Sequence, residues 1–154
     1  MQEIFVSLGF SDVSVFKQSG NVVFETAIED AGATEKKAED GFSKIFGLEV
    51  CVFVRELSEL KRIVDGSPFG DVGDEGASYW VTFMSEVPSV VTVPFRIPGT
   101  EAEVVLIRGR EAYSVTHGHG EGGRPNPFLE SRFKVEATTR NLNVLREIVS
   151  AYGR

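Results

Sequence analysis

The sequence has 154 residues, 42% of them hydrophobic, which is typical of one globular domain or two very small ones. Its 16 basic and 23 acidic side chains leave a net charge of −7, which disfavours nucleic-acid binding through counterion release. No apolar run approaches the roughly 20 residues that span a bilayer, and the start lacks the basic and apolar regions of a signal peptide. We therefore expect a cytoplasmic protein with no membrane contact.

The single cysteine, Cys51, excludes an internal disulfide and a zinc site built from several cysteines. It lies in the apolar run EVCVFV, which predicts a small core residue. The sequence contains no Walker phosphate loop, no dinucleotide-binding G-x-G-x-x-G after a strand and no G-x-S-x-G nucleophile elbow. We expect no cofactor, and whether the protein is an enzyme stays open.

The first half of the chain combines helical and strand-like patterns of apolar residues. In chain order they predict a short helix ending near Gly9, a hairpin turning at Gln18–Asn21, a helix over Ala33–Phe46 with Ala38, Phe42, Ile45 and Phe46 in one stripe, a strand over Glu49–Arg55, and a helix over Leu57–Val64. Residues 66–75 have the Gly, Pro and Asp content of a linker. We place the boundary there, between halves 1–65 and 76–154.

The second half follows a similar order. Its predicted elements are a strand over SYWVTFM, a hairpin turning near Gly109, a short helix over NPFLESRF with Asn126 as its N-cap, a strand over Lys134–Thr138, and a helix to about Tyr152.

Two segments of the sequence share one pattern. A shift of 85 positions superposes Glu49–Val64 on Lys134–Val149 without a gap and brings Arg55 onto Arg140. Strand-helix packing alone can produce such spacing, but the shared order of elements favours a duplicated unit. The same shift places the counterpart of the strand at Ser78 before Met1. We therefore predict an α+β protein of two ferredoxin-like β-α-β-β-α-β halves, the first lacking its opening strand.

Three segments, QSGNVVF at 18–24, SPF at 67–69 and TTRN at 138–141, resemble signature segments of the domain of unknown function 1697 family. The resemblance extends over essentially the whole chain and implies paired ferredoxin-like units, with no established activity to transfer. Family members usually begin with a strand leading into a glycine-rich R-G-I-N-V-G-G segment, which this sequence does not contain. The difference agrees with a missing opening strand.

Two polar stretches are candidate binding sites. Ser19, Gly20 and Asn21 form a turn whose amides and short side chains suit an anion, although an ordinary hairpin turn uses the same residue types. The second stretch, where a strand gives way to a helix, offers unpaired amides and an arginine that suit phosphate or carboxylate, although capping and packing also explain it. Its residues are Thr138, Thr139, Arg140 and Asn141.

A third stretch, THGHGEGG, alternates His117, His119 and Glu121 in the manner of a two-histidine, one-carboxylate metal site. Glycines on both sides favour a surface loop instead, so we predict no metal. Tyr79 and Trp80 could stack on bases, yet alternating burial explains them and neighbouring basic residues are absent.

The functional prediction is a binding module for a small anionic ligand, phosphate- or nucleotide-like. One alternative is an enzyme acting on a phosphorylated or nucleotide substrate in the cleft between the halves, and another is a protein-interaction domain without a ligand. The missing strand would expose an edge of the N-terminal sheet, through which we expect a homodimer.

Overall fold

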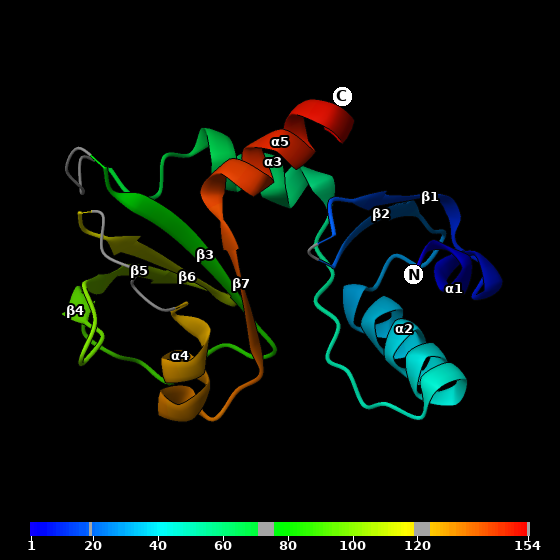
Figure 1. The fold of residues 1–154 in the computed structure, drawn as a ribbon, viewed down its shortest axis with the longest axis horizontal. Coiled ribbons are helices and arrows are strands. Elements are labelled where there is room, and N and C mark those ends of the chain that lie inside the picture. Colours follow the sequence, from blue (N-terminus) through cyan, green and yellow to red (C-terminus); the bar gives the residue numbers. More distant parts are fainter. Residues whose placement is uncertain (19, 71–75, 119–123, 154) are drawn as a thin grey trace. The chain divides into compact units, whose positions relative to one another are not determined.

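The computed structural model describes residues 1–18, 20–70, 76–118 and 124–153, and every structural statement here concerns those residues. The chain packs into two compact units, Met1–Glu56 (unit 1) and Leu57–Arg154 (unit 2) (Figure 1). Both contain helices and strands, so the predicted α+β class is confirmed. The division falls ahead of the predicted linker because helix α3 (Leu57–Asp65) packs against α5 (Leu142–Tyr152) in unit 2.

Unit 1 contains the predicted first helix, hairpin and second helix. These are α1 (Gln2–Ser7), the antiparallel strands β1 (Ser11–Phe16) and β2 (Asn21–Glu25), and α2 (Ala31–Phe46). The Asp30 side chain caps α2 by accepting a hydrogen bond from the Ala33 amide at 2.9 Å. Helix α2 ends at Gly47, which has the left-handed φ of 65° that glycine adopts without strain.

The core of unit 1 is small and aromatic. Phe5, Phe10, Val13 and Ala38 are buried in it, and the rings of Phe10 and Phe24 lie 4.6 Å apart. The apolar stripe predicted along α2 is only partly buried, since Ile45 is 52% exposed and Phe46 is 56% exposed. Ala38 is buried and Phe42 packs against the core, so the buried part of the stripe ends before the last turn of α2.

The strand predicted over Glu49–Arg55 is not formed, although its valines and phenylalanine favour one. Two backbone amides of this segment are bound by side chains of α2 instead. The Val52 amide donates to Glu39 Oε1 at 2.9 Å, and the Val54 amide donates to Glu35 Oε1 at 2.8 Å. The segment therefore runs along α2 rather than in a sheet, and Cys51 is exposed instead of lying in the core as predicted.

Unit 2 contains a five-stranded antiparallel sheet in the order β4-β5-β6-β3-β7. Its strands are β3 (Ser78–Met84), β4 (Phe95–Arg96), β5 (Ala102–Arg108), β6 (Glu111–Thr116) and β7 (Ala137–Asn141), and helix α4 (Asn126–Phe133) precedes β7. None of the helices described in either unit is long and apolar enough to cross a bilayer.

Four of these strands have the order expected of a ferredoxin-like unit, β5-β6-β3-β7. The helix expected between the first two is not present, however. Residues 85–101 connect β3 to β5 through loop and the two-residue strand β4. The final strand also begins later than predicted, at Ala137 rather than Lys134, because Lys134 adopts a left-handed φ of 57° at the end of α4.

One face of this sheet packs on α4. Leu129 and Phe133 of α4 share a buried cluster with Met84, Val104 and Ala137 of the sheet. Asn126, predicted to cap α4, lies inside its first turn, with Pro125 in the cap position and no capping bond from a side chain. The Asn126 Oδ1 atom is buried and accepts no hydrogen bond within the described part of the chain.

Candidate functional site

The first predicted site stretch is the β1–β2 turn of unit 1. Lys17 and Gly20 have positive φ values of 55° and 78°, and Asn21 pairs with Phe16 as the first residue of β2. The Asn21 Nδ2 atom donates to the Phe16 carbonyl at 3.5 Å. Gly20 and Asn21 therefore contribute to the backbone geometry of the turn, and Ser19 lies outside the described residues.

The second predicted stretch spans β7 and the start of α5 in unit 2. Asn141 ends the strand and caps the helix, with its Oδ1 accepting from the Asn143 amide at 2.9 Å. The structure thus has the predicted strand-to-helix junction, although β7 ends three residues later than expected, at Asn141 rather than Thr138. Because Asn141 Oδ1 already binds a backbone amide, the polar atoms at this junction available for a ligand come mainly from its neighbours.

The two threonines of β7 point to opposite faces of the sheet. Thr139 is buried on the α4 face, where its hydroxyl lies 2.9 Å from that of Thr82 on the adjacent strand β3. Thr138 is partly buried on the other face, and its hydroxyl accepts from Arg140 Nη1 at 2.7 Å. One threonine therefore joins strands inside the unit, and the other orients the arginine.

Arg140 is the principal charged group of the stretch. Besides its contact with Thr138, Nη1 donates to the Thr139 carbonyl at 3.0 Å, which fixes the guanidinium against the edge strand. Burial lowers the pKa of Arg140, and the positive charge of Arg124 lowers that pKa further. The surroundings of Arg140 thus disfavour its charged form, which guanidinium nonetheless retains at any physiological pH.

The sequence analysis did not relate Arg124 to Arg140. It is exposed and immediately precedes Pro125, the residue that caps α4. Its distance of 16 positions from Arg140 hides the relation in the sequence, because a loop, α4 and a turn separate the two. The one clue in the sequence was that the helix α4 is followed by β7, the strand that carries Arg140.

Arg55, which the 85-residue shift superposes on Arg140, has similar local geometry but a different charged neighbour. Its Nη1 donates to the carbonyl of the preceding residue, Val54, at 2.8 Å, as Arg140 does to Thr139. The same Nη1 lies 3.7 Å from Glu35 Oε1, and the two side chains are only 6% and 16% exposed. Arg55 is therefore neutralised by a carboxylate of its own unit.

A second feature recurs at equivalent positions. The Ala137 amide at the start of β7 donates to Glu130 Oε1 of α4 at 3.0 Å. Val52, its counterpart under the same shift, donates to Glu39 of α2. In both units a helix glutamate thus binds the backbone amide three residues before the arginine, but the glutamates themselves are not related by the shift, which would place Glu39 on Arg124.

The histidine-rich loop falls largely outside the described residues, which include His117 but neither His119 nor Glu121. His117 Nε2 lies 3.2 Å from Glu103 Oε2, beside the β5–β6 pair. No group of three or more His, Cys, Asp or Glu side chains is arranged to hold a metal within the described ranges. The indole of Trp80, considered for base stacking, donates to the Thr116 hydroxyl at 3.1 Å.

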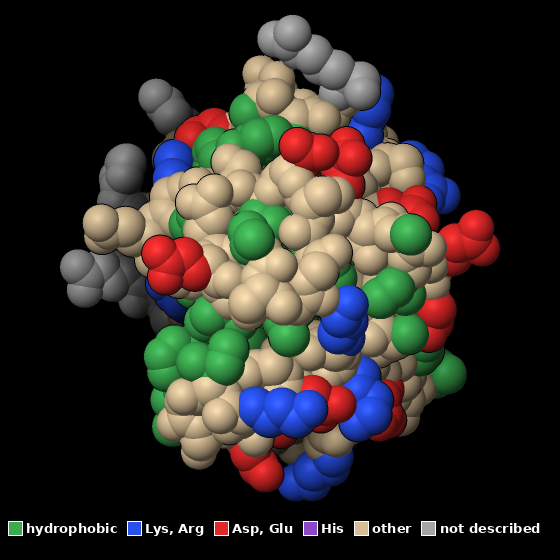
Figure 2. Space-filling model, turned by 90° about the vertical axis from the view of Figure 1, so that its right-hand side faces the viewer, with side chains coloured by type: hydrophobic (Ala, Val, Ile, Leu, Met, Phe, Trp, Pro, Cys, Tyr) green, Lys and Arg blue, Asp and Glu red, His purple; other side chains and the backbone are tan. Residues whose placement is uncertain are grey.

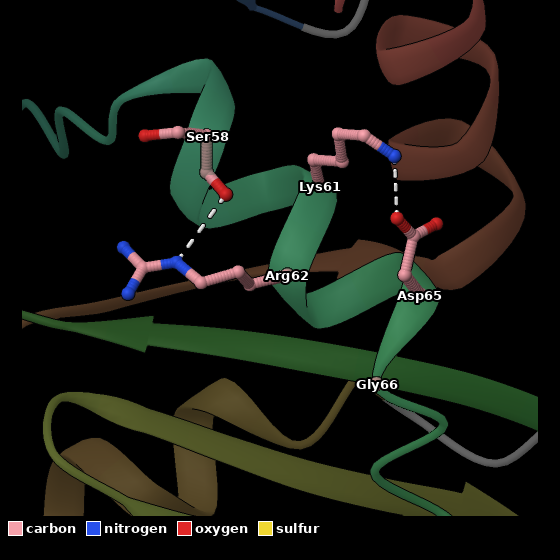
Figure 3. Close-up of a pocket in the computed structure, with 5 residues that line it drawn as sticks. All are labelled: Ser58, Lys61, Arg62, Asp65 and Gly66. Atoms are coloured by element: carbon pink, nitrogen blue, oxygen red, sulfur yellow. Dashed lines mark hydrogen bonds and ion pairs between the residues drawn. The ribbon is translucent and has the colours of Figure 1, made fainter.

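An open hollow lies on α3, and none of the residues that line it was predicted for binding (Figure 3). Lys61 pairs with Asp65 one turn along, and Arg62 Nε donates to the Ser58 carbonyl at 3.4 Å. Gly66 also lines the hollow. A Cβ atom added at Gly66 would lie only 2.6 Å from the Arg62 carbonyl oxygen. These charged groups interact within one helix, so the hollow has the character of an ordinary solvated helix surface.

Comparison with known proteins identifies a family but no activity. The family described as Protein of unknown function (DUF1697) matches residues 1–113, from α1 to the middle of β6. Arg124 and the Thr138–Asn141 stretch lie beyond the matched residues. No curated protein and no solved structure matches the chain significantly. Since the match covers most of the sequence, the chain belongs to the DUF1697 family of proteins of unknown function.

Proposed function

We propose that unit 2 binds a small anionic ligand, phosphate- or nucleotide-like, at Arg140. Thr138 orients the guanidinium through its hydroxyl, and the Thr139 carbonyl holds it against the strand. Asn141 completes the stretch at the start of α5, where the positive end of the helix dipole favours an anion. The turn residues Ser19, Gly20 and Asn21 belong to unit 1 and stay a separate prediction.

The observation that carries this proposal is the fixed orientation of a partly buried guanidinium. Arg140 Nη1 donates to the Thr138 hydroxyl at 2.7 Å and to the Thr139 carbonyl at 3.0 Å. Burial lowers the pKa of Arg140, and the charge of Arg124 lowers it further, so the charged form is disfavoured. A bound anion would stabilise that charged form.

The proposal is tested by thermal and urea unfolding with and without inorganic phosphate, followed by fluorescence. The single tryptophan, Trp80, lies in β3 and so reports on unit 2. Phosphate should stabilise the parent by about 2.7 kcal/mol at one hundred times its dissociation constant, through mass action. Arg140→Ala should lose most of that gain.

Arg146→Ala is the matched control, since Arg146 is an exposed arginine of α5 in the same unit. It should keep the full phosphate gain. Equal gains in the parent and Arg140→Ala, or no gain in the parent up to millimolar phosphate, would remove the anion site. The comparison holds even if Arg140→Ala changes the stability, because the gain from phosphate is the difference between the same variant with and without phosphate.

We also propose that unit 1 mediates a homodimer through the exposed edge of the β1–β2 sheet. Each strand has one partner among the described residues, and a two-stranded sheet is marginal alone. Unit 1 also carries most of the exposed large apolar side chains: Met1, Val6, Val15, Ile45, Phe46, Leu48 and Val50. Figure 2 shows such side chains reaching the surface between charged ones.

A further inference from the structure

We propose that unit 1 accepts an extended segment of a partner protein as a strand between β2 and residues 52–54, and that this segment alternates apolar side chains with basic ones. The inference is independent of the anion site proposed for unit 2. It also differs from the proposed dimer, because it gives unit 1 a central strand and names the chemistry of the partner that supplies it.

Unit 2 shows where such a strand belongs. Its central strand β3 pairs antiparallel with β6 on one side and with β7 on the other. The 85-residue shift superposes residues 52–56 on β7, and the β1–β2 hairpin precedes them as the β5–β6 hairpin precedes β7. Within the described part of unit 1, however, β2 pairs with β1 alone. Unit 1 therefore contains counterparts of both neighbours of β3, and its described residues place no strand between them.

The backbone of residues 52–54 is arranged to pair with an added strand. The Val52 and Val54 amides both donate to glutamates of α2. Because alternate amides of an extended chain point to opposite sides, the Phe53 amide points away from α2. In unit 2 the corresponding residue under the shift, Thr138, pairs with β3. The glutamates thus bind one edge of the segment, and the opposite edge is the one that β7 uses to bind its central strand.

The core of unit 1 sets the apolar pattern of the partner. Val22 and Phe24 of β2 pack against this core, and so does Val52. Val22 and Phe24 are two residues apart, so one face of the β1–β2 sheet covers the core. A strand between β2 and residues 52–54 would continue that face. Its side chains should therefore be apolar at every second position.

Charge sets the polar positions of the partner. Residues 1–56 contain 10 acidic and 5 basic side chains, a net charge of −5. Exposed carboxylates lie at the end of β2, at Glu25, and on either side of residues 52–54, at Glu49 and Glu56. Basic side chains between the apolar ones would be attracted to this surface, and acidic ones would be repelled. The occupant is thus a basic, amphipathic strand, bound by β-augmentation.

The probe is a seven-residue peptide, the length of β3, that alternates valine and lysine. Its binding to the whole chain is measured by calorimetry. We expect an isomer with the same residues grouped by type, and an analogue with glutamate in place of lysine, to bind at least about tenfold more weakly. Equally tight binding of either control peptide, or no binding of the probe, would overturn the inference.

N-methylation distinguishes a central strand from one added to an edge. Methyl groups on the amides of alternate residues block one edge of the peptide, and methyl groups on the remaining amides block the other. A peptide between β2 and residues 52–54 uses both edges, so either modification should weaken binding about tenfold through the loss of two or three hydrogen bonds. If only one modification weakens binding, the peptide adds to a single edge and the inference is overturned.

Hydrogen exchange locates the peptide. Exchange should slow in β2 and at Phe53, and it should not change in β4 and β7, the outer strands of the unit 2 sheet. Slowing in β2 alone, or in unit 2, would contradict the proposed position.

A pair of proline variants tests the Phe53 edge directly. Phe53→Pro removes the amide that faces the peptide and should weaken binding about tenfold. Val50→Pro is the matched control, since Val50 is exposed and its counterpart under the shift lies ahead of β7. It should bind the peptide as the parent does. Equal affinity of the parent and Phe53→Pro would overturn the inference, and the peptide series provides the same decision if Phe53→Pro fails to fold.

Discussion

The buried contact between Glu35 and Arg55 provides the sharpest test of how unit 1 is held together. In Glu35→Gln the side-chain oxygen can still accept from the Val54 amide, but the negative charge 3.7 Å from Arg55 Nη1 is lost. Leaving one partner of a buried ion pair uncompensated costs about 3–5 kcal/mol. We expect about 3 kcal/mol, since Arg55 keeps its bond to the Val54 carbonyl.

Glu39→Gln is the matched substitution on the same helix. Glu39 likewise accepts one backbone amide of the segment, that of Val52. Replacing its charged acceptor with a neutral one should cost about 1 kcal/mol. The difference between the two variants, about 2 kcal/mol, isolates the ion pair.

These values are large for a unit of this size. At roughly 0.05–0.15 kcal/mol per residue, unit 1 would have about 3–8 kcal/mol of stability. Glu35→Gln should therefore shift the urea transition seen by far-UV circular dichroism, to which α2 contributes strongly, to much lower concentration. The Trp80 fluorescence transition should shift less, because Trp80 belongs to unit 2 and the substitution lies in unit 1. Equal shifts for Glu35→Gln and Glu39→Gln, or a matching shift of the Trp80 transition, would refute this reasoning.

Two further predictions concern the sheets. Thr82→Val should destabilise unit 2 by about 1–3 kcal/mol by leaving the buried Thr139 hydroxyl without its partner, whereas the Thr82→Val, Thr139→Val double variant should be nearly neutral; additive costs in a urea double-mutant cycle would contradict a shared bond. Light scattering should find that the parent is a dimer. Val15→Glu, on exposed β1, should dissociate the dimer by placing like charges on both sides of the two-fold axis. Val87→Glu, at an exposed site of unit 2, should leave the dimer intact. A strictly monomeric parent would remove the dimer.

Local patterns predicted most of the secondary structure. The apolar spacing of α2, α3 and α5 and the glycines at the hairpin turns act between near neighbours in sequence, so the elements they indicate were found. The strand assigned to Glu49–Arg55 failed for the opposite reason. Its β-favouring residues needed a partner strand, and the donors of Val52 and Val54 were taken by glutamates more than a dozen residues earlier.

In the candidate site, too, local features were predicted and contacts between residues distant in sequence were not. Thr138–Asn141 was recognised as a strand-to-helix junction from local composition, and its arginine was singled out by comparison with Arg55. Arg124 could not be found in that way, because its relation to Arg140 depends on how α4 lies along β7. The exposure of Cys51, Ile45 and Phe46 was likewise unpredictable from alternation alone, since it depends on how far the small core of unit 1 extends.

The glutamates that bind the Glu49–Arg55 segment also affect its tendency to aggregate. A run such as VCVFV, apolar and rich in β-branched residues, is the kind of sequence that stacks into fibrils when its backbone is free to pair. Glu35 and Glu39 occupy two of its amide donors, and a carboxylate offers no donor in return, so it cannot extend a sheet. We therefore expect Glu35 and Glu39 to protect this aggregation-prone segment, and replacing them should shorten the lag phase of fibril formation.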